Sequence, residues 1–446
     1  MSPGYLYLRS QERTEMKTRQ TAGEASRAAP RIVQLEPGNM LARFGTFASF
    51  RVPAYRIYYG CMLGHWFAWS MQQVVRALLM FRLTGSGTTI GGLALASALP
   101  TLSLSLLGGA IGDSVQKKFI LVIGRGVLAL NALAISFALY SGFLSRSHPD
   151  SWWLLIVSAA IEGATNGFVL PTNISIVPEL VGEDLIMNGL SLAVLGGNVF
   201  QLIGPTVGGF LIDAHGFLPV YFFMSCLFVS DAVMSTLLPR RSPMAPRKTK
   251  PLRDAMDGIL YLRTNPTILL LVIFAVCHIV SGLPFMQLLP VFTERVLKVT
   301  ASKLGLLTSA AGVGALIGSL VIASLPRKNR GILVLASGMI MGVPILIFVS
   351  SHSWLLCLLL MPFIGLGPAM HASLTSTLVQ TYVDPDYRSR MQGLVTMAGG
   401  LASFGTLLGG LLTDVIGVRL AVASEALFLT LVTAMLMVWS RLPSLE

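Results

Sequence analysis

Residues 204–216 read GPTVGGFLIDAHG, and residues 405–417 read GTLLGGLLTDVIG. At an offset of 201, these two stretches share six identities in thirteen positions, including four glycines and one aspartate. Each is an apolar run that ends in an aspartate and then a glycine, which is typical of a helix that reaches a turn. The second half of the chain therefore repeats the first.

Other matches extend this repeat. At an offset of 214, Gln73 aligns with Gln287, and His65 falls within one position of His278. Parallel six-helix repeats are a transporter architecture, in which the substrate site lies between the halves near the middle of the membrane. The repeat therefore predicts an alternating-access carrier rather than a channel or a receptor.

The composition of the 446 residues supports this class. Apolar amino acids make up 54% and charged ones only 12%, whereas soluble proteins have about 45–50% and about 25%. A soluble protein with a solvated surface is therefore excluded. The four cysteines lie far apart in apolar runs without CxxC spacing, so they predict neither a disulfide framework nor a zinc site.

A helix needs about 20 apolar residues to cross a hydrocarbon core about 30 Å thick. Runs of this length predict an all-α, polytopic membrane protein with 12 transmembrane helices, arranged as two pseudo-symmetric six-helix bundles. The predicted spans are 57–82, 88–111, 119–142, 152–176, 188–212, 217–238, 266–292, 302–325, 331–350, 354–378, 391–413 and 418–439.

These spans divide the chain into five parts. We predict a disordered cytoplasmic N-terminal segment (1–55), an N-terminal bundle (56–238), a cytoplasmic linker with an amphipathic helix (239–265), a C-terminal bundle (266–440) and a cytoplasmic tail (441–446). The linker helix is indicated by apolar residues at helical spacing opposite charged ones, a pattern typical of helices that lie on a membrane surface.

The positive charges predict the orientation. If the N-terminus is cytoplasmic, 24 of the 32 Lys and Arg residues lie in inner segments and six in outer segments. Because positive residues favour the cytoplasmic side, we predict a multi-pass protein of the cell (inner) membrane with both termini in the cytoplasm. The net charge of +12 then reflects topology and attraction to anionic membrane lipids, and no nucleic-acid partner is expected.

Residues 109–118 read GAIGDSVQKK. They resemble the GxxxDRxGRK loop of the major facilitator superfamily, except that Ser114 and Gln116 replace an arginine and a glycine. The resemblance implies a gating loop that contains Gly109, Asp113, Lys117 and Lys118. A charge at a helix end that only fixes the topology is the alternative interpretation.

A second motif is similar to the antiporter motif of the same superfamily. It comprises Gly204, Pro205, Gly208 and Gly209, with Phe200 where a glycine is usual. Residues 50–51, 71–73 and 83–86 resemble the branch that holds macrolide exporters, the enterobactin exporter and a lysophospholipid transporter. These resemblances cover about residues 47–440 and imply export of a small molecule.

In this superfamily helices one, four, seven and ten line the cavity, and the same helices carry much of the intramembrane polarity of this chain. The cavity and substrate candidates are His65, Trp69, Gln73, Arg76, Glu162, Asn166, His278, Gln287 and His371. Ionisable groups at membrane depth need partners or water. Arg76 could pair with Glu162 and Arg125 with Asp231, either as structural salt bridges or as parts of the transport mechanism.

Proton coupling would need a buried carboxylate, and the candidates are Glu162, Asp231 and Glu425. Asp213 and Asp414 occupy equivalent outer turns and are interpreted as turn and helix caps.

The sequence therefore predicts a secondary active transporter, a monomer, that exports a small apolar or amphipathic compound (a drug, siderophore or secondary metabolite) by alternating access and proton antiport. The alternative is a flippase for a lipid-like substrate or an uptake permease of the same superfamily. No GxxxxGK[ST], HExxH or GxSxG motif is present, so no enzyme, catalytic residue, cofactor or metal site is predicted.

Overall fold

The computed structural model describes residues 45–145, 147–239, 260–324, 329–385, 387–439 and 442, and residues 106–114 by their backbone only. The described residues from Ser49 onward form one compact unit, which is helical, with no strand among them. The predicted N-terminal segment up to residue 44, most of the linker (240–259) and all of the tail except residue 442 lie outside the described residues.

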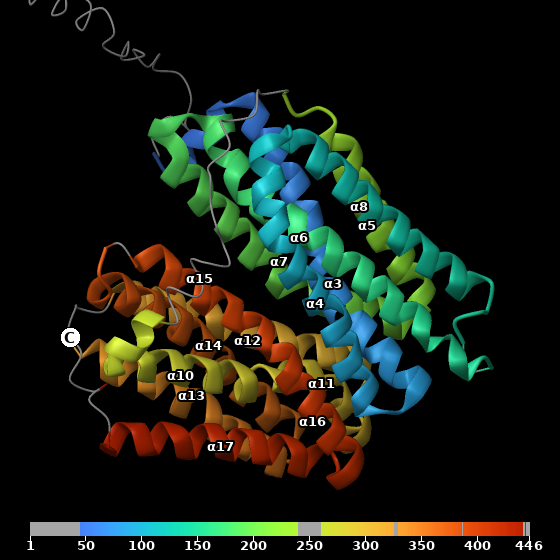
Figure 1. The fold of residues 1–446 in the computed structure, drawn as a ribbon. Helices are drawn as coiled ribbons and strands as arrows, with labels where there is room; N and C mark the ends of the chain where they lie inside the picture. The colour runs from blue at the N-terminus through green and yellow to red at the C-terminus, as the bar shows by residue number, and fades with distance from the viewer. Residues whose placement is uncertain are drawn as a thin grey trace, which may run out of the picture. The chain divides into compact units, whose positions relative to one another are not determined.

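The first half of the described chain contains six long helices that pack mainly on one another (Figure 1). They are α3 (Pro53–Thr84), α4 (Gly87–Ser114), α5 (Lys117–Tyr140), α6 (Trp153–Val181), α7 (Ile186–His215) and α8 (Phe217–Ser235). Within this group α4 packs on α6, α5 on α8 and α3 on α7.

The second half forms another group of helices (Figure 1). They are α10 (Pro266–Gly282), α11 (Pro284–Phe292), η4 (Thr293–Leu297), α12 (Ala301–Ser324), α13 (Arg330–Ser350), α14 (Trp354–Tyr382), α15 (Arg388–Ala398), η5 (Gly399–Leu401), α16 (Ala402–Ile416) and α17 (Val418–Trp439). Here α14 packs on both α12 and α13, and α13 packs on α17.

Two predicted spans are interrupted. The predicted helix 266–292 ends at Gly282 and restarts as α11 at Pro284, because a proline cannot donate the backbone hydrogen bond that would continue the helix. The predicted helix 391–413 contains η5 at Gly399–Leu401, where two consecutive glycines weaken the α-helix.

Eleven of the described helical segments are long and apolar enough to cross a membrane. The remaining predicted span, 57–82, lies within α3, which is 32 residues long but carries several buried polar side chains, among them Gln72 and Arg76. These side chains lower the hydropathy of α3 without exposing polar groups to lipid. The prediction of an all-α polytopic membrane protein is confirmed.

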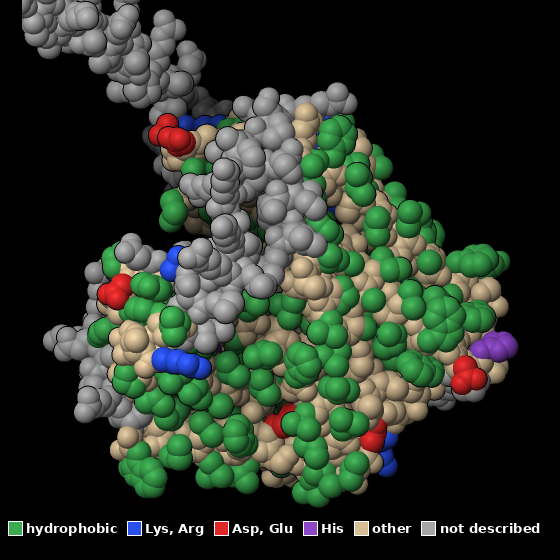
Figure 2. All heavy atoms as spheres, viewed as in Figure 1, with side chains coloured by type: hydrophobic (Ala, Val, Ile, Leu, Met, Phe, Trp, Pro, Cys, Tyr) green, Lys and Arg blue, Asp and Glu red, His purple; other side chains and the backbone are tan. Residues whose placement is uncertain are grey.

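The surface fits this class. Figure 2 shows hydrophobic side chains spread over the described helices, with few charged side chains between them. Large apolar residues are widely exposed, including Ile123 at 65% and Phe137 at 69%. Such an extensive apolar surface is unusual for a soluble monomer and suits contact with lipid.

Short turns place consecutive helices antiparallel, so the bundle has two ends. We call the end that carries the α3–α4 and α7–α8 turns the Asp213 end, and the opposite end, where α5 begins, the Lys117 end. At the Asp213 end the turns use Gly85 (φ 68°) and Gly216 (φ 80°), a backbone region that glycine adopts without strain.

The two groups of helices meet along two pairs, α7 with α12 and α4 with α16. A Cβ atom on Gly209 would lie 2.3 Å from the carbonyl oxygen of Ala301, and one on Gly305 would lie 2.3 Å from that of Pro205. Small residues let helix backbones approach this closely. We call the contact between α7 and α12 the glycine seam.

The orientation in the membrane can be tested with single cysteines in a background that lacks the native four. Ser147, at the Asp213 end, and Asp184, at the Lys117 end, are both exposed. If the termini are cytoplasmic, an impermeant maleimide applied to intact cells should label Ser147→Cys and spare Asp184→Cys. Permeabilised cells should label both, which controls for reactivity. Equal labelling in intact cells would contradict the predicted orientation.

Candidate functional site

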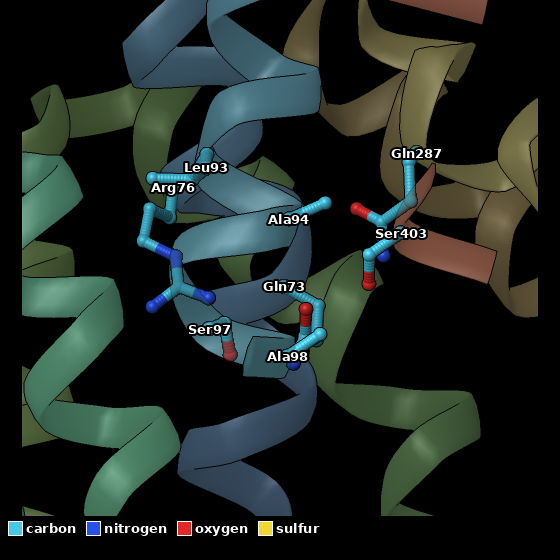
Figure 3. Close-up of a pocket in the computed structure, with 8 residues that line it drawn as sticks. All are labelled: Gln73, Arg76, Leu93, Ala94, Ser97, Ala98, Gln287 and Ser403. Carbon is cyan, nitrogen blue, oxygen red and sulfur yellow. The ribbon is translucent and has the colours of Figure 1, made fainter. Parts of the chain in front are cut away.

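A polar cavity of about 170 Å³ lies between the two groups of helices. It is lined by Gln73, Arg76, Leu93, Ala94, Ser97, Ala98, Gln287 and Ser403. Figure 3 shows that Gln287 and Ser403 reach toward it from the second half, opposite the side chains of α3 and α4. The two glutamines that align in the sequence repeat therefore line one cavity.

A second, mostly apolar cavity of about 280 Å³ adjoins the polar cavity and shares Gln73 with it. Its lining includes Trp69 on α3, Pro205 on α7, Met286 on α11 and Ile364 on α14. A third cavity, of about 240 Å³, is lined by α7, α12 and α14 and shares Gln201 with the second. The halves thus enclose a polar region and an apolar region side by side.

The predicted pairing of Arg76 with Glu162 is confirmed. Nη1 of Arg76 is in ion-pair contact with Oε2 of Glu162, and Nε2 of Gln72 donates to the same oxygen over 2.9 Å. Arg76 is 4% exposed and Glu162 2%. Glu162 lies behind Arg76 and is not among the residues that line the polar cavity.

The second predicted pair also forms, inside the first group of helices. Nη1 of Arg125 lies 2.7 Å from Oδ1 of Asp231, and Nδ1 of His65 lies 3.5 Å from Oδ2 of the same carboxylate. Arg125 further donates to Ser235 over 2.6 Å and to Asn173 over 3.1 Å. The structure therefore places His65 and Asp231 in a buried network rather than in the lining of the three cavities.

The two other candidate histidines meet in the second group. The rings of His278 and His371 stack with centroids 4.1 Å apart and planes at 7°. Thr375 Oγ1 lies 3.4 Å from Nε2 of His371, and the ring of Phe274 packs on the edge of the pair. Neither histidine lines the three cavities, and neither does the buried Asn166 of α6.

Glu425, on α17, differs from the other candidate carboxylates. It is 8% exposed, and within the described residues neither of its carboxylate oxygens has a hydrogen-bond partner. Oε1 lies against the backbone of α16, where a Cβ on Gly409 would come within 2.4 Å of it. The ion pairs of the described residues do not include Glu425.

At the Asp213 end, each half caps a helix of the other half. Asp213 accepts hydrogen bonds from the backbone N–H of Ala301 (3.0 Å) and of Ser302 (2.8 Å), at the start of α12. Asp414 accepts from the backbone N–H of Gly87 (2.8 Å) and of Thr88 (2.9 Å), at the start of α4. We call these two contacts the aspartate latches.

Two arginines add to the closure at this end. Nη2 of Arg82 lies 2.7 Å from Oε1 of Glu294, and Arg295 donates to the carbonyl oxygen of Gly85. Among the described residues, the hydrogen bonds and the ion pair between the halves lie between this end and the middle of the helices. The structure is therefore closed at the Asp213 end.

A family model described as the Major Facilitator Superfamily matches residues 58–405 and residues 299–445. The chain belongs to the major facilitator superfamily. This confirms the resemblance of the sequence motifs and the prediction that the protein is a transporter rather than an enzyme. It is a multi-pass membrane protein, and a small-molecule substrate is consistent with this superfamily.

Relatives within the superfamily are distant. The chain is 25% identical over 372 residues to the uncharacterized MFS-type transporter YfiS of Bacillus subtilis, covering 79% of this chain and 85% of that protein. It is 24% identical over 318 residues to the enterobactin exporter EntS of Shigella boydii, covering 69% and 72%.

Solved structures confirm the superfamily fold. A crystal structure of the nucleoside transporter NupG matches with a TM-score of 0.70 at 14% identity, over 86% of this chain and 98% of that one. A bacterial homologue of the lysosomal transporter Spinster, crystallised in an inward-facing and unoccupied conformation, matches with a TM-score of 0.66 at 14% identity, over 87% and 98%.

The antiporter-like motif of the superfamily uses two faces of α7. Gly204 and Gly208 face α3, where added Cβ atoms would lie 1.9 Å from Ser70 Oγ and 3.1 Å from a methyl group of Val75. Pro205 and Gly209 face α12 across the glycine seam. The small residues of the motif therefore let α7 pack closely against α3 on one face and against α12 on another.

The loop that resembles the gating loop of the superfamily is described in part. Nζ of Lys117 lies 2.6 Å from Oε1 of Glu179 and donates to the carbonyl oxygen of Ser175, while Lys118 donates to that of Thr236. Gly109 and Asp113 belong to the residues whose side chains are not described. The two lysines bind within the first half of the chain.

Some residues that line the cavity carry no distinguishing signal in the sequence. Ser97 and Ser403 are isolated hydroxyls in apolar helices, and no pattern distinguishes them from packing residues. Asp213 and Asp414 were expected to cap turns and helices. They do cap helices, but in the opposite half of the molecule, and only their equivalent places in the repeat could have indicated a shared role.

Proposed function

We propose that the protein is a secondary exporter that moves a small apolar or amphipathic compound by alternating access. The observation that carries this proposal is the set of cavities between two halves whose contacts gather at the Asp213 end. A site enclosed by two repeats that separate at one end and close at the other is what alternating access requires.

Support for export comes from two directions. The relative EntS is named as an exporter, and the antiporter-like residues of α7 form the packing faces described above. With the termini in the cytoplasm, as we propose, the Asp213 end is extracellular, and alternating access then assigns a state closed at this end to substrate uptake from the cytoplasm. Lys117 and Lys118 belong to the loop that we assign to gating on the cytoplasmic side.

We propose Glu425, rather than Glu162 or Asp231, as the residue that carries the coupling proton. The latter two carboxylates form ion pairs with Arg76 and Arg125, so each already has a countercharge. A carboxylate without a cation at membrane depth is costly and marks proton pathways in transporters. Glu425 is therefore the best candidate among the three for a group that gains and loses a proton during the cycle.

The alternative remains a flippase or uptake permease for a lipid-like substrate. Its support is the second cavity, whose lining of tryptophan, methionine, leucine and isoleucine side chains suits an acyl chain. The two functions differ in direction and substrate, so one transport experiment separates them.

Everted vesicles from cells that produce the protein should be supplied with labelled enterobactin, erythromycin or lysophosphatidylglycerol. Respiration acidifies the lumen of such vesicles. If the protein is a proton-driven exporter, enterobactin or erythromycin should accumulate, and nigericin, which removes the pH gradient, should abolish the accumulation. Accumulation of the lysolipid alone, or inward transport in right-side-out vesicles, would instead support the alternative.

Glu425→Gln should separate coupling from binding. The amide cannot carry a proton, so the variant should lose accumulation against a gradient while it still exchanges internal for external substrate. The control is Ser424→Ala, which removes a neighbouring hydroxyl that bonds only the backbone of its own helix. Uphill accumulation at the normal rate in Glu425→Gln would exclude Glu425 as the proton carrier.

A further inference from the structure

The polar cavity presents several groups without partners. Within the described residues, the side-chain amides of Gln73 and Gln287 and the hydroxyls of Ser97 and Ser403 make no hydrogen bond, although all four line the cavity. These groups come from α3, α4, α11 and α16, and so from both halves. A cavity lined in this way is built to hold a ligand with several hydrogen-bonding oxygens.

The charged side chain that lines this cavity is a cation, and its carboxylate partner lies behind it. Arg76 is the charged residue of its lining, and Nε of Arg76 is buried without a hydrogen-bond partner among the described residues. Glu162 occupies another nitrogen of the same guanidinium and is itself also bound by Gln72. No carboxylate lines the cavity, so its lining favours an anionic ligand group.

The adjoining cavity has the opposite character. Trp69, Leu283, Met286 and Ile364 belong to its lining, which contains no charged side chain. Gln73 lines both cavities, so a ligand that spans them passes this amide. A molecule that fills both spaces has an oxygen-rich end and an apolar body.

We infer that the substrate is an amphipathic organic anion whose acidic oxygen atoms bind Arg76, Gln73 and Gln287 while its apolar body lies against Trp69 and Met286. This inference rests on the proposed transport function and specifies its substrate class. The side chains that bind the anionic end come from both halves. The bound anion therefore also bridges the two groups of helices.

The test uses a pair of small probes of the same size, 2-naphthaleneacetic acid, which is an anion at neutral pH, and 2-naphthaleneacetamide, which is neutral. Binding to the protein in lipid nanodiscs is measured by quenching of tryptophan fluorescence, with empty nanodiscs as the blank. Because a hydrogen bond between two charged groups is stronger than one between neutral groups, the acid should bind the wild-type protein about tenfold or more tightly than the amide.

Variants then show which residue causes the preference for the acid over the amide. The double variant Arg76→Gln with Glu162→Gln removes both charges together, so no buried charge is left unpaired, and it should bind the acid and the amide equally. Arg76→Lys should retain the preference for the acid. The control is Arg82→Gln with Glu294→Gln, an equivalent removal of an ion pair from α3 outside the cavity, which should leave the preference unchanged.

Equal binding of acid and amide to the wild-type protein would overturn the inference. So would a preference that persists in the double variant, or the absence of binding by both probes up to their solubility limits. Binding does not depend on transport direction or on protons. A preference for the acid in a protein that fails the vesicle experiment would therefore contradict the proposed export and not the substrate class.

Discussion

Glu162→Gln should lower the stability of the protein by about 3–5 kcal/mol, because Arg76 then loses its countercharge in a buried position. Thermal unfolding in detergent and the amount of protein in the membrane both measure this loss. The exchanged variant, Glu162→Arg with Arg76→Glu, should recover much of it. Gln72, which donates to Glu162, can turn its amide so that the carbonyl oxygen accepts from the new arginine.

The exchange also separates folding from substrate binding. In the exchanged variant the cation stands at position 162, which does not line the polar cavity, and a carboxylate replaces the guanidinium at position 76. Stability should therefore return while binding of an organic acid does not. The control is Arg82→Gln, since Arg82 and Glu294 are about one-third exposed at 30% and 29%, and such a pair contributes only about 0–1 kcal/mol.

If Glu162→Gln is as stable as the wild-type protein and transports uphill with an unchanged dependence on pH, both the pairing role and a proton role of Glu162 are contradicted. If Glu162→Gln is unstable and the exchanged variant recovers no stability, the carboxylate stabilises the protein only at position 162, and the ion pair with Arg76 does not by itself account for its role.

The double variant Asp213→Ala with Asp414→Ala should open the Asp213 end. Each carboxylate caps the start of a helix in the other half through two backbone N–H groups. A lost helix cap costs about 1 kcal/mol, and the loss of a negative charge at a helix start adds about 0.3–1 kcal/mol. Together the two substitutions should shift the population by about 3 kcal/mol, roughly a hundredfold, toward the open state.

Spin labels at Ser147 and Lys298 can report this opening, since both are exposed at the Asp213 end and belong to different halves. In the double variant, a longer distance should become the main population. The control is Asp150→Ala, which removes another exposed carboxylate at the same end that bonds neither α4 nor α12. An unchanged distance distribution in the double variant would show that the aspartate latches do not hold this end closed.

The helices could be predicted because the membrane imposes their length and their apolar character. The exceptions had local causes that the sequence also contains: Pro284 interrupts one predicted span, and Gly399 and Gly400 interrupt another. The ion pairs could be predicted as well. An arginine at membrane depth needs a carboxylate at the same depth, and few carboxylates qualify.

The substrate candidates were harder to place, because a single polar residue does not show which way its helix faces. Gln73 and Gln287 align in the repeat and line one cavity. His65 and His278 are almost as well aligned, yet His65 contacts Asp231 and His278 stacks on His371. A histidine can pair with a carboxylate, a second ring or a ligand, so only the packing of the neighbouring helices decides.

The glycine seam has a consequence for the rate of the transport cycle. Where Gly209 meets Ala301 and Gly305 meets Pro205, backbone lies against backbone with no side chain between them. At these two points the surfaces can part and meet again without any rotamer changing, because no side chains interlock there. Beside them, the hydroxyls of Thr206 and Ser309 lie 2.6 Å apart, so this contact must break when the halves separate. We expect the backbone contacts to add little friction to the movement, and the aspartate latches and this hydroxyl pair to set how often the halves separate.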